Sequence, residues 1–471
     1  MFYRKIINEL NQWAEGKDRK PLILRGARQV GKTTAIDIFS KEFDRYIYLN
    51  LERKEDAEIF DNDLPLKDLI QAIYLSKNIS HSGGKTLLFI DEIQNSPQAV
   101  KMMRYFYESA GDIHVTAAGS LLETVIGKDP ISFPVGRVQY KFMYPLTFEE
   151  FLAAIQAEQV LNLYNTIPCP EFAFTQILRY FHKYCLIGGM PEIVKNYRVK
   201  EDIPSLTPVY QGLLTSYLDD VSKYARNTTM VQVIRHAIES VPFEAGKRIK
   251  FQGFGRSNYR SREMGEALKT LERAMLIYLL YPSTSTEPPI IPDLRKSPKL
   301  QFLDTGLINY FVNLQSYFYK TSDLHSFYQG LLAEHIVGQE LLAIDMNKPG
   351  KTSFWIREKK QSNAEVDFII PYKEYIIPVE VKSGKTGVLR SLHQFIDRSN
   401  HPYAIRLYAG PLEKTRTKTP GGKPYTLLNL PYFLAGKIND YIEWLMEEKP
   451  TKHGKTAKTT KAPTGTDFRK Q

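Results

Sequence analysis

Residues 21–39 read PLILRGARQVGKTTAIDIF. A short apolar stretch leads into a loop with two glycines, and the residues after the loop have helical spacing. The loop matches the pattern GxxxxGK[ST] in the strand, loop, helix context that the pattern requires. Main-chain N–H groups of such a loop bind phosphate, and the N-terminus of the following helix favours an anion. The stretch therefore predicts a nucleotide site in an α/β domain.

Each residue type in this loop has an expected role. Lys32 is expected to reach the β- and γ-phosphates of ATP, and Thr33 is expected to be a ligand of Mg²⁺. A chance match by a glycine-rich turn is the alternative, and the flanking strand and helix patterns argue against it. The predicted nucleotide-binding residues of the loop are Gly26, Ala27, Arg28, Gln29, Val30, Gly31, Lys32, Thr33 and Thr34.

A second motif, KTLLFIDEIQNSP at 85–97, is typical of a buried parallel strand that ends in acidic residues. Asp91 is expected to hold Mg²⁺ through water, and Glu92 is expected to be catalytic by polarising the attacking water. An acidic turn that merely caps a strand is the alternative, but the two motifs together favour the nucleotide site. A further strand, IHVTAAGS, ends in Ser120, whose hydroxyl is placed to sense the γ-phosphate.

Length and composition set the wider frame. A chain of 471 residues suggests three domains, or two and an appendage. With 43% hydrophobic and 24% charged residues the chain is typical of a globular protein, and it has no run of 18 apolar residues that would predict a membrane span. The N-terminus lacks the pattern of a signal peptide, which makes the cytoplasm the expected location. Two cysteines, Cys169 and Cys185, indicate neither a disulfide framework nor a thiolate metal site.

The formal net charge of +11 is concentrated at the end of the chain. Residues 449–471 hold seven Lys or Arg and one Asp, a charge of +6, which leaves +5 for the rest. This segment has almost no apolar residues, so we expect residues 447–471 to be a disordered basic tail. Such a tail either keeps the chain soluble or makes weak, salt-sensitive contacts with a polyanion.

Residues 20–150 resemble the P-loop ATPase of a large prokaryotic AAA-type family that carries an uncharacterised C-terminal domain. GRVQYKFMYPLTFEEFL at 136–152 and YCLIGGMPEIVKNY at 184–197 are similar to the linking motifs of that family. The resemblance implies an ATPase domain with a helical extension over 1–225, and it places Gly189 and Pro191 near the adenine. It also makes Arg137 a candidate arginine finger acting in trans, which would require a homo-oligomer; a structural arginine in a loop is the alternative.

The middle of the chain, 226–300, is expected to be a winged helix. SREMGEALKTLERAMLIYLLYPSTST at 261–286 has helical spacing and then becomes strand-like, as the end of a winged helix does, and the family resemblance implies the same. The segment 243–262 holds six basic residues and one acid among Phe251, Phe254 and Tyr259. This mixture is typical of a segment that contacts DNA. A protein-interaction element or a solvated basic face would show the same mixture of residues. Asp304, just beyond, is expected to be a turn or cap residue.

Residues 324–446 predict a helix, three strands, a helix and a strand. EVDFIIPYKEYIIPVEVKSG at 365–384 supplies two of the strands. This order resembles the core of the restriction-endonuclease-like PD-(D/E)xK nucleases. The resemblance implies that Asp367 and Glu380 share a divalent cation, expected to be Mg²⁺, that Lys382 orients the attacking water, and that Glu334 completes the catalytic set. No proline precedes Asp367, and a Glu-x-Lys pair can also be an ordinary exposed ion pair.

The expected fold is therefore α/β throughout: a P-loop AAA-type ATPase domain, a winged-helix middle, and a restriction-endonuclease-like C-terminal domain over 301–446. The expected function is ATP binding and hydrolysis coupled to DNA binding or processing. The main alternative is a regulatory ATPase switch whose C-terminal domain is a catalytically inactive interaction domain. Remodelling of protein partners is a third option, with no sequence feature in its favour beyond the AAA-type domain.

Overall fold

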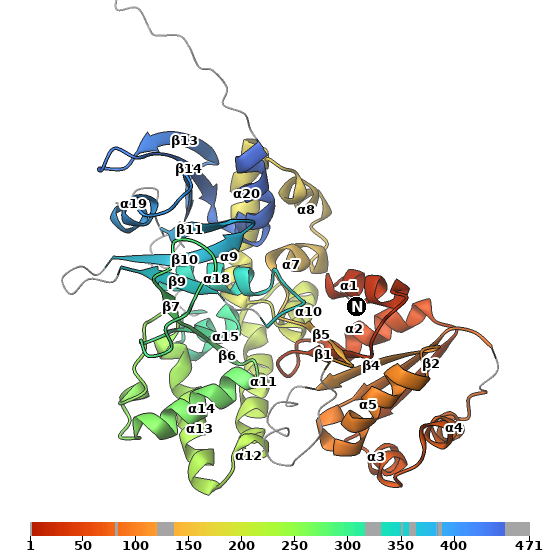
Figure 1. Ribbon diagram of the computed structural model, residues 1–471. Coiled ribbons are helices and arrows are strands. Elements are labelled where there is room, and N and C mark those ends of the chain that lie inside the picture. Colours follow the sequence, from red (N-terminus) through yellow and green to blue (C-terminus); the bar gives the residue numbers. More distant parts are fainter. Residues whose placement is uncertain are drawn as a thin grey trace, which may run out of the picture.

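The computed structural model describes residues 2–80, 83–119, 136–315, 331–349, 352–357, 364–382, 384 and 389–447. Figure 1 shows an N-terminal lobe, coloured red to orange, beside a larger body formed by the middle and C-terminal parts. Ser120 and residues 448–471 of the predicted tail lie outside the described residues. No helix in the described ranges is both long and apolar enough to cross a membrane.

The N-terminal lobe is a three-layer α/β structure. Its five strands are all parallel and follow the spatial order β2, β3, β4, β1, β5, so each connection crosses over the sheet. Helices α1 and α2 pack on one face and α3 to α5 on the other, which gives two separate hydrophobic clusters. The bounds are α1 (Ile6–Glu15), β1 (Leu22–Arg25), α2 (Lys32–Phe39), β2 (Arg45–Asn50), α3 (Lys54–Asp61), α4 (Leu66–Ser76), β3 (Thr86–Asp91), α5 (Pro97–Ser109), β4 (Ile113–Gly119) and β5 (Gln139–Phe142).

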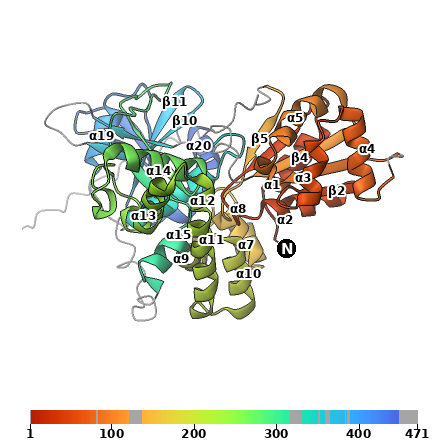
Figure 2. The same ribbon diagram turned by 90° about the horizontal axis from the view of Figure 1, so that it is seen from below.

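A helical extension follows and stands between the two lobes (Figure 2). Helix α7 begins with a capping box, in which Thr147 and Glu150 bond each other's main-chain N–H groups. The helices are α7 (Phe148–Ala154), α8 (Glu158–Asn165), α9 (Phe174–Ile187), α10 (Pro191–Lys200), α11 (Thr207–Asp219) and α12 (Val221–Tyr224). Both cysteines of the chain are buried free thiols.

The middle segment contains two packed helices and then an antiparallel strand pair. These are α13 (Thr228–Glu244), α14 (Ser261–Arg273), β6 (Ile277–Leu280) and β8 (Lys299–Phe302), and β6 pairs with β8. A helix followed by two antiparallel strands was expected here; the winged-helix assignment itself stays a prediction. The intervening β7 (Pro282–Ser283) pairs with the C-terminal sheet instead. The expected boundary at residue 300 falls inside β8, so this strand belongs to both parts.

The C-terminal part is built on a mixed seven-stranded sheet in the order β13, β14, β12, β11, β10, β9, β7. Its core has the predicted order of helix, three strands, helix and strand, given by α18, β9, β10, β11, α19 and β12. The bounds are α15 (Thr305–Phe311), α18 (Leu331–Leu342), β9 (Ser353–Ile356), β10 (Glu365–Tyr372), β11 (Tyr375–Val381), α19 (Arg390–Ile396), β12 (Tyr403–Tyr408), β13 (Glu413–Lys418), β14 (Pro424–Pro431) and α20 (Ile438–Glu447).

One hydrophobic cluster runs through the whole molecule, from Ile6 in α1 to Leu445 in α20. The main chains of the two lobes also meet directly, because the N–H of Phe142 in β5 donates to the carbonyl of Met346 at 2.8 Å. The N-terminal and C-terminal parts are therefore packed against each other and are not separate domains joined by a flexible linker.

Candidate functional site

The predicted phosphate-binding loop lies between β1 and α2, where the sequence places it. Gly26 cannot be replaced without strain, because a Cβ atom there would lie 2.4 Å from the carbonyl oxygen of Met143. Gly31 has φ of +94°, in the left-handed region that favours glycine. Both glycines of the motif are thus required by the backbone itself, and α2 begins at Lys32, directly after the second.

The side chain of Lys32 folds back over its own loop. Its ammonium donates to the carbonyl oxygens of Gly26 at 3.0 Å and Ala27 at 2.9 Å. Burial lowers the pKa of Lys32 to about 8, and the nearby carboxylates of Glu92 and Asp91 partly oppose that shift. Among the described residues, the hydrogen bonds of this buried ammonium go to neutral carbonyls, and its contact with phosphate stays a prediction.

Thr33 and Asp91 lie together, as two ligands of one Mg²⁺ must. The Thr33 hydroxyl donates to Oδ2 of Asp91 at 2.8 Å, and the hydroxyl of Tyr48 donates to the same oxygen at 3.3 Å. Hydroxyl and carboxylate oxygens are the ligands that Mg²⁺ takes in phosphate sites, so this pair fits the ion. Burial raises the pKa of Asp91, and the bond from Thr33 opposes it.

Glu92 follows Asp91 at the end of β3 in the left-handed region, with φ of +52°. Its carboxylate accepts a hydrogen bond from the side-chain amide of Gln94. Burial raises the pKa of Glu92. A strained backbone with an anchored carboxylate is compatible with the predicted role of orienting water, which stays a prediction.

The turn Gly188-Gly189-Met190-Pro191 belongs to the helical extension and lies next to the phosphate-binding loop. The Cγ of Pro191 would lie 3.7 Å from a Cβ at Gly31, so this turn is next to the phosphate loop. Gly189 is held on both sides: its carbonyl accepts from Leu146 N at 2.7 Å, and its N–H donates to Oδ2 of Asp304 at 2.6 Å. The structure thus brings Gly189 and Pro191 to the loop; their contact with adenine stays a prediction.

Two arginines differ in where they lie. Arg28 of the loop pairs with Asp220 at the end of α11, a partner that sequence reasoning missed because 192 residues separate the two. Arg137 pairs with Glu108 of α5 at 3.0 Å and faces Tyr107, so within this chain it is a surface ion pair. Its role as an arginine finger in a homo-oligomer stays a prediction.

In the C-terminal part, three of the four predicted catalytic residues lie in α18, β10 and β11, and Lys382 directly follows β11. Lys382 pairs with Oε1 of Glu380 at 2.6 Å, while Oε2 of Glu380 is buried without a hydrogen-bond partner among the described residues. Oδ2 of Asp367 accepts from the N–H of Val381 at 2.8 Å, which fixes Asp367 beside the Glu-x-Lys strand.

Two residues of this cluster were missed by sequence reasoning. Lys299 of β8 contacts the carboxylates of Glu334, Glu365 and Asp367, and Glu365 also pairs with Arg248 at 3.4 Å. The available signals were a lysine at the start of the short strand KLQF and an acid two residues before Asp367.

Charges in the cluster act on one another. Burial first and the Asp367 charge second raise the pKa values of both Glu334 and Glu380. Burial opposes protonation of Lys299, but its carboxylate neighbours outweigh burial and raise its pKa. Within the described ranges, no three acidic, histidine or cysteine side chains are set to hold a common metal ion. This absence concerns groups of three or more ligands, so the cation shared by Asp367 and Glu380 alone stays a prediction.

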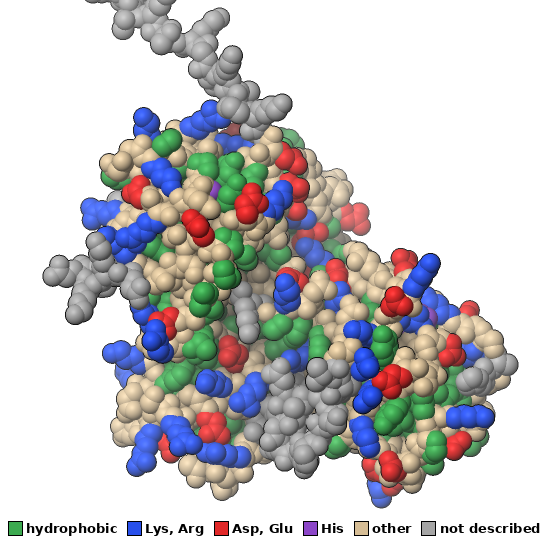
Figure 3. Space-filling view, in the orientation of Figure 1, with side chains coloured by type: hydrophobic (Ala, Val, Ile, Leu, Met, Phe, Trp, Pro, Cys, Tyr) green, Lys and Arg blue, Asp and Glu red, His purple; other side chains and the backbone are tan. Residues whose placement is uncertain are grey.

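The predicted DNA-contacting segment, residues 243–262, has one buried and two partly buried aromatic rings. Phe254 is only 3% exposed, and Phe251 and Tyr259 pack against the main hydrophobic cluster. Phe254 therefore supports the fold, while Phe251 and Tyr259 keep part of their surface exposed, and stacking of these rings on bases stays a prediction. Basic side chains do gather on the surface over α13 and α14 (Figure 3). DNA contact stays a prediction.

Comparison with protein families agrees with the N-terminal site. Residues 18–152 match the family model described as AAA domain. We refer to this matched segment as the AAA domain. Two further models, both domains of unknown function, match residues 178–317 (DUF8612) and 329–420 (DUF4143). None of the curated proteins compared with the chain matches it.

Solved structures are similar only at a distance. The Walker-type ATPase PABY2304 of Pyrococcus abyssi has 14% identity and a TM-score of 0.44, covering 66% of this chain and 96% of its own. The Holliday junction branch migration motor RuvB of Thermotoga maritima has 14% identity and a TM-score of 0.28, covering 59% and 90%. The Aeropyrum pernix ORC2 protein has 12% identity and a TM-score of 0.28, covering 67% and 94%. Because these TM-scores are low, the assignment rests on the family match and the geometry of the AAA domain.

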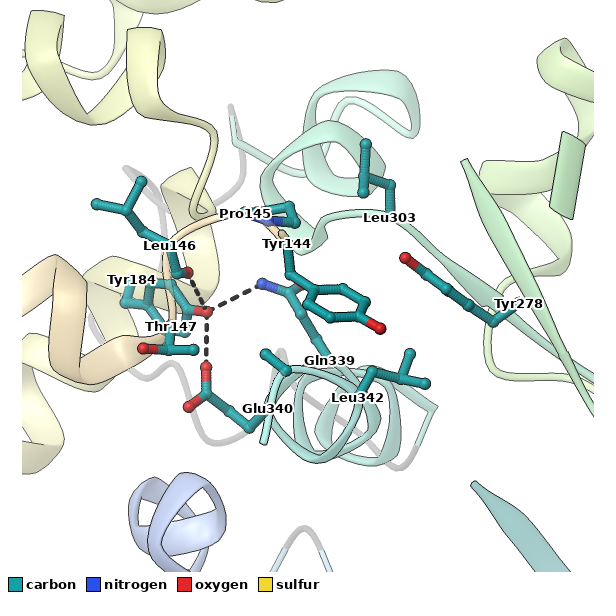
Figure 4. Close-up of a pocket in the computed structure, with 11 residues that line it drawn as sticks. Tyr144, Pro145, Leu146, Thr147, Tyr184, Tyr278, Leu303, Gln339, Glu340 and Leu342 are labelled. Carbon is teal, nitrogen blue, oxygen red and sulfur yellow. Dashed lines mark hydrogen bonds between the residues drawn. The ribbon is translucent and has the colours of Figure 1, made fainter. Parts of the chain in front are cut away.

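A small cavity lies between the segment 144–147, which follows the last strand of the AAA domain, and helix α18. A cluster of hydrogen bonds at this cavity connects the two. Figure 4 shows the hydroxyl of Tyr184 at the centre, within 2.9 Å of Leu146 O and 2.7 Å of Oε1 of Glu340. A hydroxyl has one proton, so it can donate to only one of these oxygens at a time. Gln339 donates to this hydroxyl at 3.0 Å, and Phe148 N donates to Glu340 at 3.0 Å.

Burial raises the pKa of Glu340 to about 7. This carboxylate is therefore a buried group whose charge depends on pH near neutrality, at the contact between α7, α9 and α18.

Proposed function

We propose that this protein binds and hydrolyses Mg²⁺-ATP in its AAA domain and that the nucleotide state controls the C-terminal domain, which acts on DNA. The observation that carries the ATP part is the convergence of Lys32, Thr33 and Asp91 at the end of the parallel sheet. This convergence brings together the phosphate-loop motif and the acidic-strand motif, which are separate in the sequence.

The residues of the loop have separate tasks in this proposal. The main-chain N–H groups of the loop hold the phosphates, and the ammonium of Lys32 leaves the two carbonyls for the β- and γ-phosphates. Thr33 and Asp91 hold Mg²⁺, which supplies charge neutralisation when it is bound. Glu92 orients the water that attacks. Ser120 senses the γ-phosphate, and Gly189 and Pro191 contact the adenine.

Coupling to the C-terminal domain is supported by two buried carboxylates. Asp304 accepts the N–H of Gly189, beside the phosphate loop, and also caps α15 by accepting from Gly306 N at 2.9 Å and Leu307 N at 3.2 Å. Glu340 of α18 accepts from Phe148 at the start of α7. A shift of the turn at Gly189 on nucleotide binding would strain both contacts, because packed interiors deform little.

DNA is the proposed target because the order of elements and the Glu380-x-Lys382 pair are nuclease-like, and because basic side chains gather over α13 and α14. A second candidate is a regulatory ATPase switch whose C-terminal domain is an inactive interaction module. The place of Lys299 within the acidic cluster favours this second candidate.

One experiment separates the two candidates. The full chain is incubated with Mg²⁺ or Mn²⁺ and supercoiled, linear or branched DNA, with and without ATP, beside Lys382→Ala and Lys32→Ala variants. DNA cleavage that disappears in Lys382→Ala supports the nuclease. ATP turnover without cleavage supports the switch. Cleavage that is unchanged in Lys382→Ala contradicts the assignment of the C-terminal residues.

A further inference from the structure

Lys299, the first residue of β8, is a buried lysine whose ammonium lies among three carboxylates. Its Nζ is 2.8 Å from Oε1 of Glu365 and 3.5 Å from Oδ1 of Asp367, and it donates to Oε1 of Glu334. Its side chain is only 7% exposed. These partners come from β10 and α18, so one side chain of the middle segment pairs with two elements of the C-terminal domain.

The surroundings of Lys299 are also arranged for a cation. The ring of Phe354 in β9 has the Lys299 ammonium 4.9 Å and the Arg248 guanidinium 5.3 Å from its centroid. An aromatic face attracts a cation through its quadrupole, more strongly when the cation is shielded from water. Arg248 in turn pairs with Oε2 of Glu365, so both oxygens of this carboxylate are engaged.

In this arrangement the ammonium of Lys299 lies among the carboxylates that would otherwise bind a metal ion. A divalent cation needs its oxygens at about 2.1 to 2.6 Å around one centre. Here the oxygens of Glu334, Glu365 and Asp367 surround a nitrogen atom. No metal-binding group of three acidic, histidine or cysteine side chains occurs in the described part of the chain. The ammonium neutralises the carboxylates in place of a metal.

We infer that Lys299 is the resident cation of the acidic cluster and that it excludes divalent metal ions from Glu334, Glu365 and Asp367. The cluster is thus a latent metal site, closed by a lysine that β8 delivers. This inference deepens the second candidate function, an inactive C-terminal domain, and rests on the proposed nuclease-like cluster for the identity of the site, while its geometry stands on the contacts of Lys299.

The strand that carries Lys299 also leads to the nucleotide site. Strand β8 ends at Phe302, and two residues later Asp304 binds the N–H of Gly189 beside the phosphate loop. His335, next to Glu334 in α18, accepts from the N–H of Phe302 at 3.0 Å and so fixes β8 against α18. A movement at Gly189 would therefore pull on the strand that holds the lysine in the cluster.

Binding of Mn²⁺ to the full chain tests the inference directly. All variants carry Asp91→Asn, which removes the carboxylate of the ATP site as a competing ligand. Bound Mn²⁺ is counted by loss of the free-ion electron paramagnetic resonance signal, and the thermal unfolding midpoint is measured with and without Mn²⁺. We expect the protein with Lys299 to bind no Mn²⁺ at the cluster and the Lys299→Met variant to bind one ion per chain, with a rise in its unfolding midpoint.

Three further variants define the site. Lys299→Arg keeps the cation and should bind no Mn²⁺, and Asp367→Asn added to Lys299→Met should abolish the gained binding. Lys299→Gln removes the positive charge, keeps a polar side chain and leaves all three carboxylates in place, and so serves if Lys299→Met does not fold.

Two results would overturn the inference. One is Mn²⁺ binding by the Lys299 protein that Asp367→Asn abolishes. The other is a folded Lys299→Met or Lys299→Gln variant that gains no Mn²⁺. ATP turnover is measured separately in chains that retain Asp91, so failure of the proposed ATPase activity is distinguished from failure of this inference.

Discussion

The main-chain N–H of Gly189 donates a hydrogen bond of 2.6 Å to Oδ2 of Asp304, across 115 residues of sequence. Gly189 lies in the turn beside the phosphate loop, and Asp304 caps the first helix after β8. The fit is tight, because a Cβ at the preceding Gly188 would lie 2.0 Å from Oδ1 of Asp304. The buried carboxylate of Asp304 thus connects the turn beside the phosphate loop with helix α15, which precedes helix α18 of the C-terminal domain.

Replacing Asp304 with Asn should remove the contact with Gly189 but keep the helix cap. Asn is a good N-cap, so its oxygen can still accept from Gly306 and Leu307, while its NH₂ group then faces the N–H of Gly189. We expect a loss of about 1 to 3 kcal/mol in the free energy of unfolding, and a larger loss for Asp304→Ala. Urea denaturation measures both.

The exposed Asp61→Asn, at the end of α3, is the matched control and should leave the stability unchanged. If Asp304→Asn unfolds at the same urea concentration as the original protein, the buried contact has no stabilising role.

Glu340 should make the stability depend on pH. Its folded-state pKa of about 7 lies above the ordinary value of 4.5, so between these pH values the folded state binds more protons than the unfolded state. The free energy of unfolding should then fall as pH rises from 4.5 to 7, by at most about 1.4 kcal/mol per pH unit from this group. Thermal unfolding across this range detects the slope.

Glu340→Gln removes the titrating group and keeps an oxygen for Phe148 and Tyr184. The variant should show a flatter dependence on pH and a higher unfolding midpoint than the original protein at pH 8. An identical pH profile for both proteins would show that Glu340 does not titrate in this range.

Lys32→Met should separate stability from nucleotide binding. The ammonium of Lys32 is buried, so its removal relieves a desolvation cost while losing two hydrogen bonds to neutral carbonyls. We expect the free energy of unfolding of the ligand-free variant to be unchanged or higher by about 1 kcal/mol. We also expect that Mg²⁺-ATP no longer raises the unfolding midpoint of the variant. Differential scanning fluorimetry with and without Mg²⁺-ATP measures both effects.

The control is Lys41→Ala, an exposed lysine just after α2, which should retain the full stabilisation by Mg²⁺-ATP. A normal rise of the Lys32→Met midpoint on addition of Mg²⁺-ATP would place nucleotide binding elsewhere.

The sequence predicted those parts of the site that depend on local pattern. Lys32, Thr33 and Asp91 follow from strand and helix periodicity beside motifs whose spacing is set by phosphate geometry, and the structure brings the three together. The order of helix, strands and helix in the C-terminal part follows from the same periodicity.

Long-range partners could not be predicted in the same way. Arg28 with Asp220, and Lys299 with Glu334, meet because separate helices and strands pack together, and no spacing within the sequence encodes such a meeting. Asp304 was expected to be a cap, and it is one, but its second role toward Gly189 exists only in the folded chain. The pairing of β8 with β6, across the predicted boundary at residue 300, likewise depends on the folded chain.

The central claim, that the nucleotide state of the AAA domain reaches the C-terminal domain through Asp304, is tested most directly by amide hydrogen exchange. Exchange at Gly189 and over residues 299–307 is compared without nucleotide and with a non-hydrolysable ATP analogue and Mg²⁺. We predict that the analogue changes exchange in both segments of the original protein, and only at Gly189 in Asp304→Asn. Unchanged exchange over 299–307, in a protein whose raised unfolding midpoint shows that the analogue is bound, would contradict the claim.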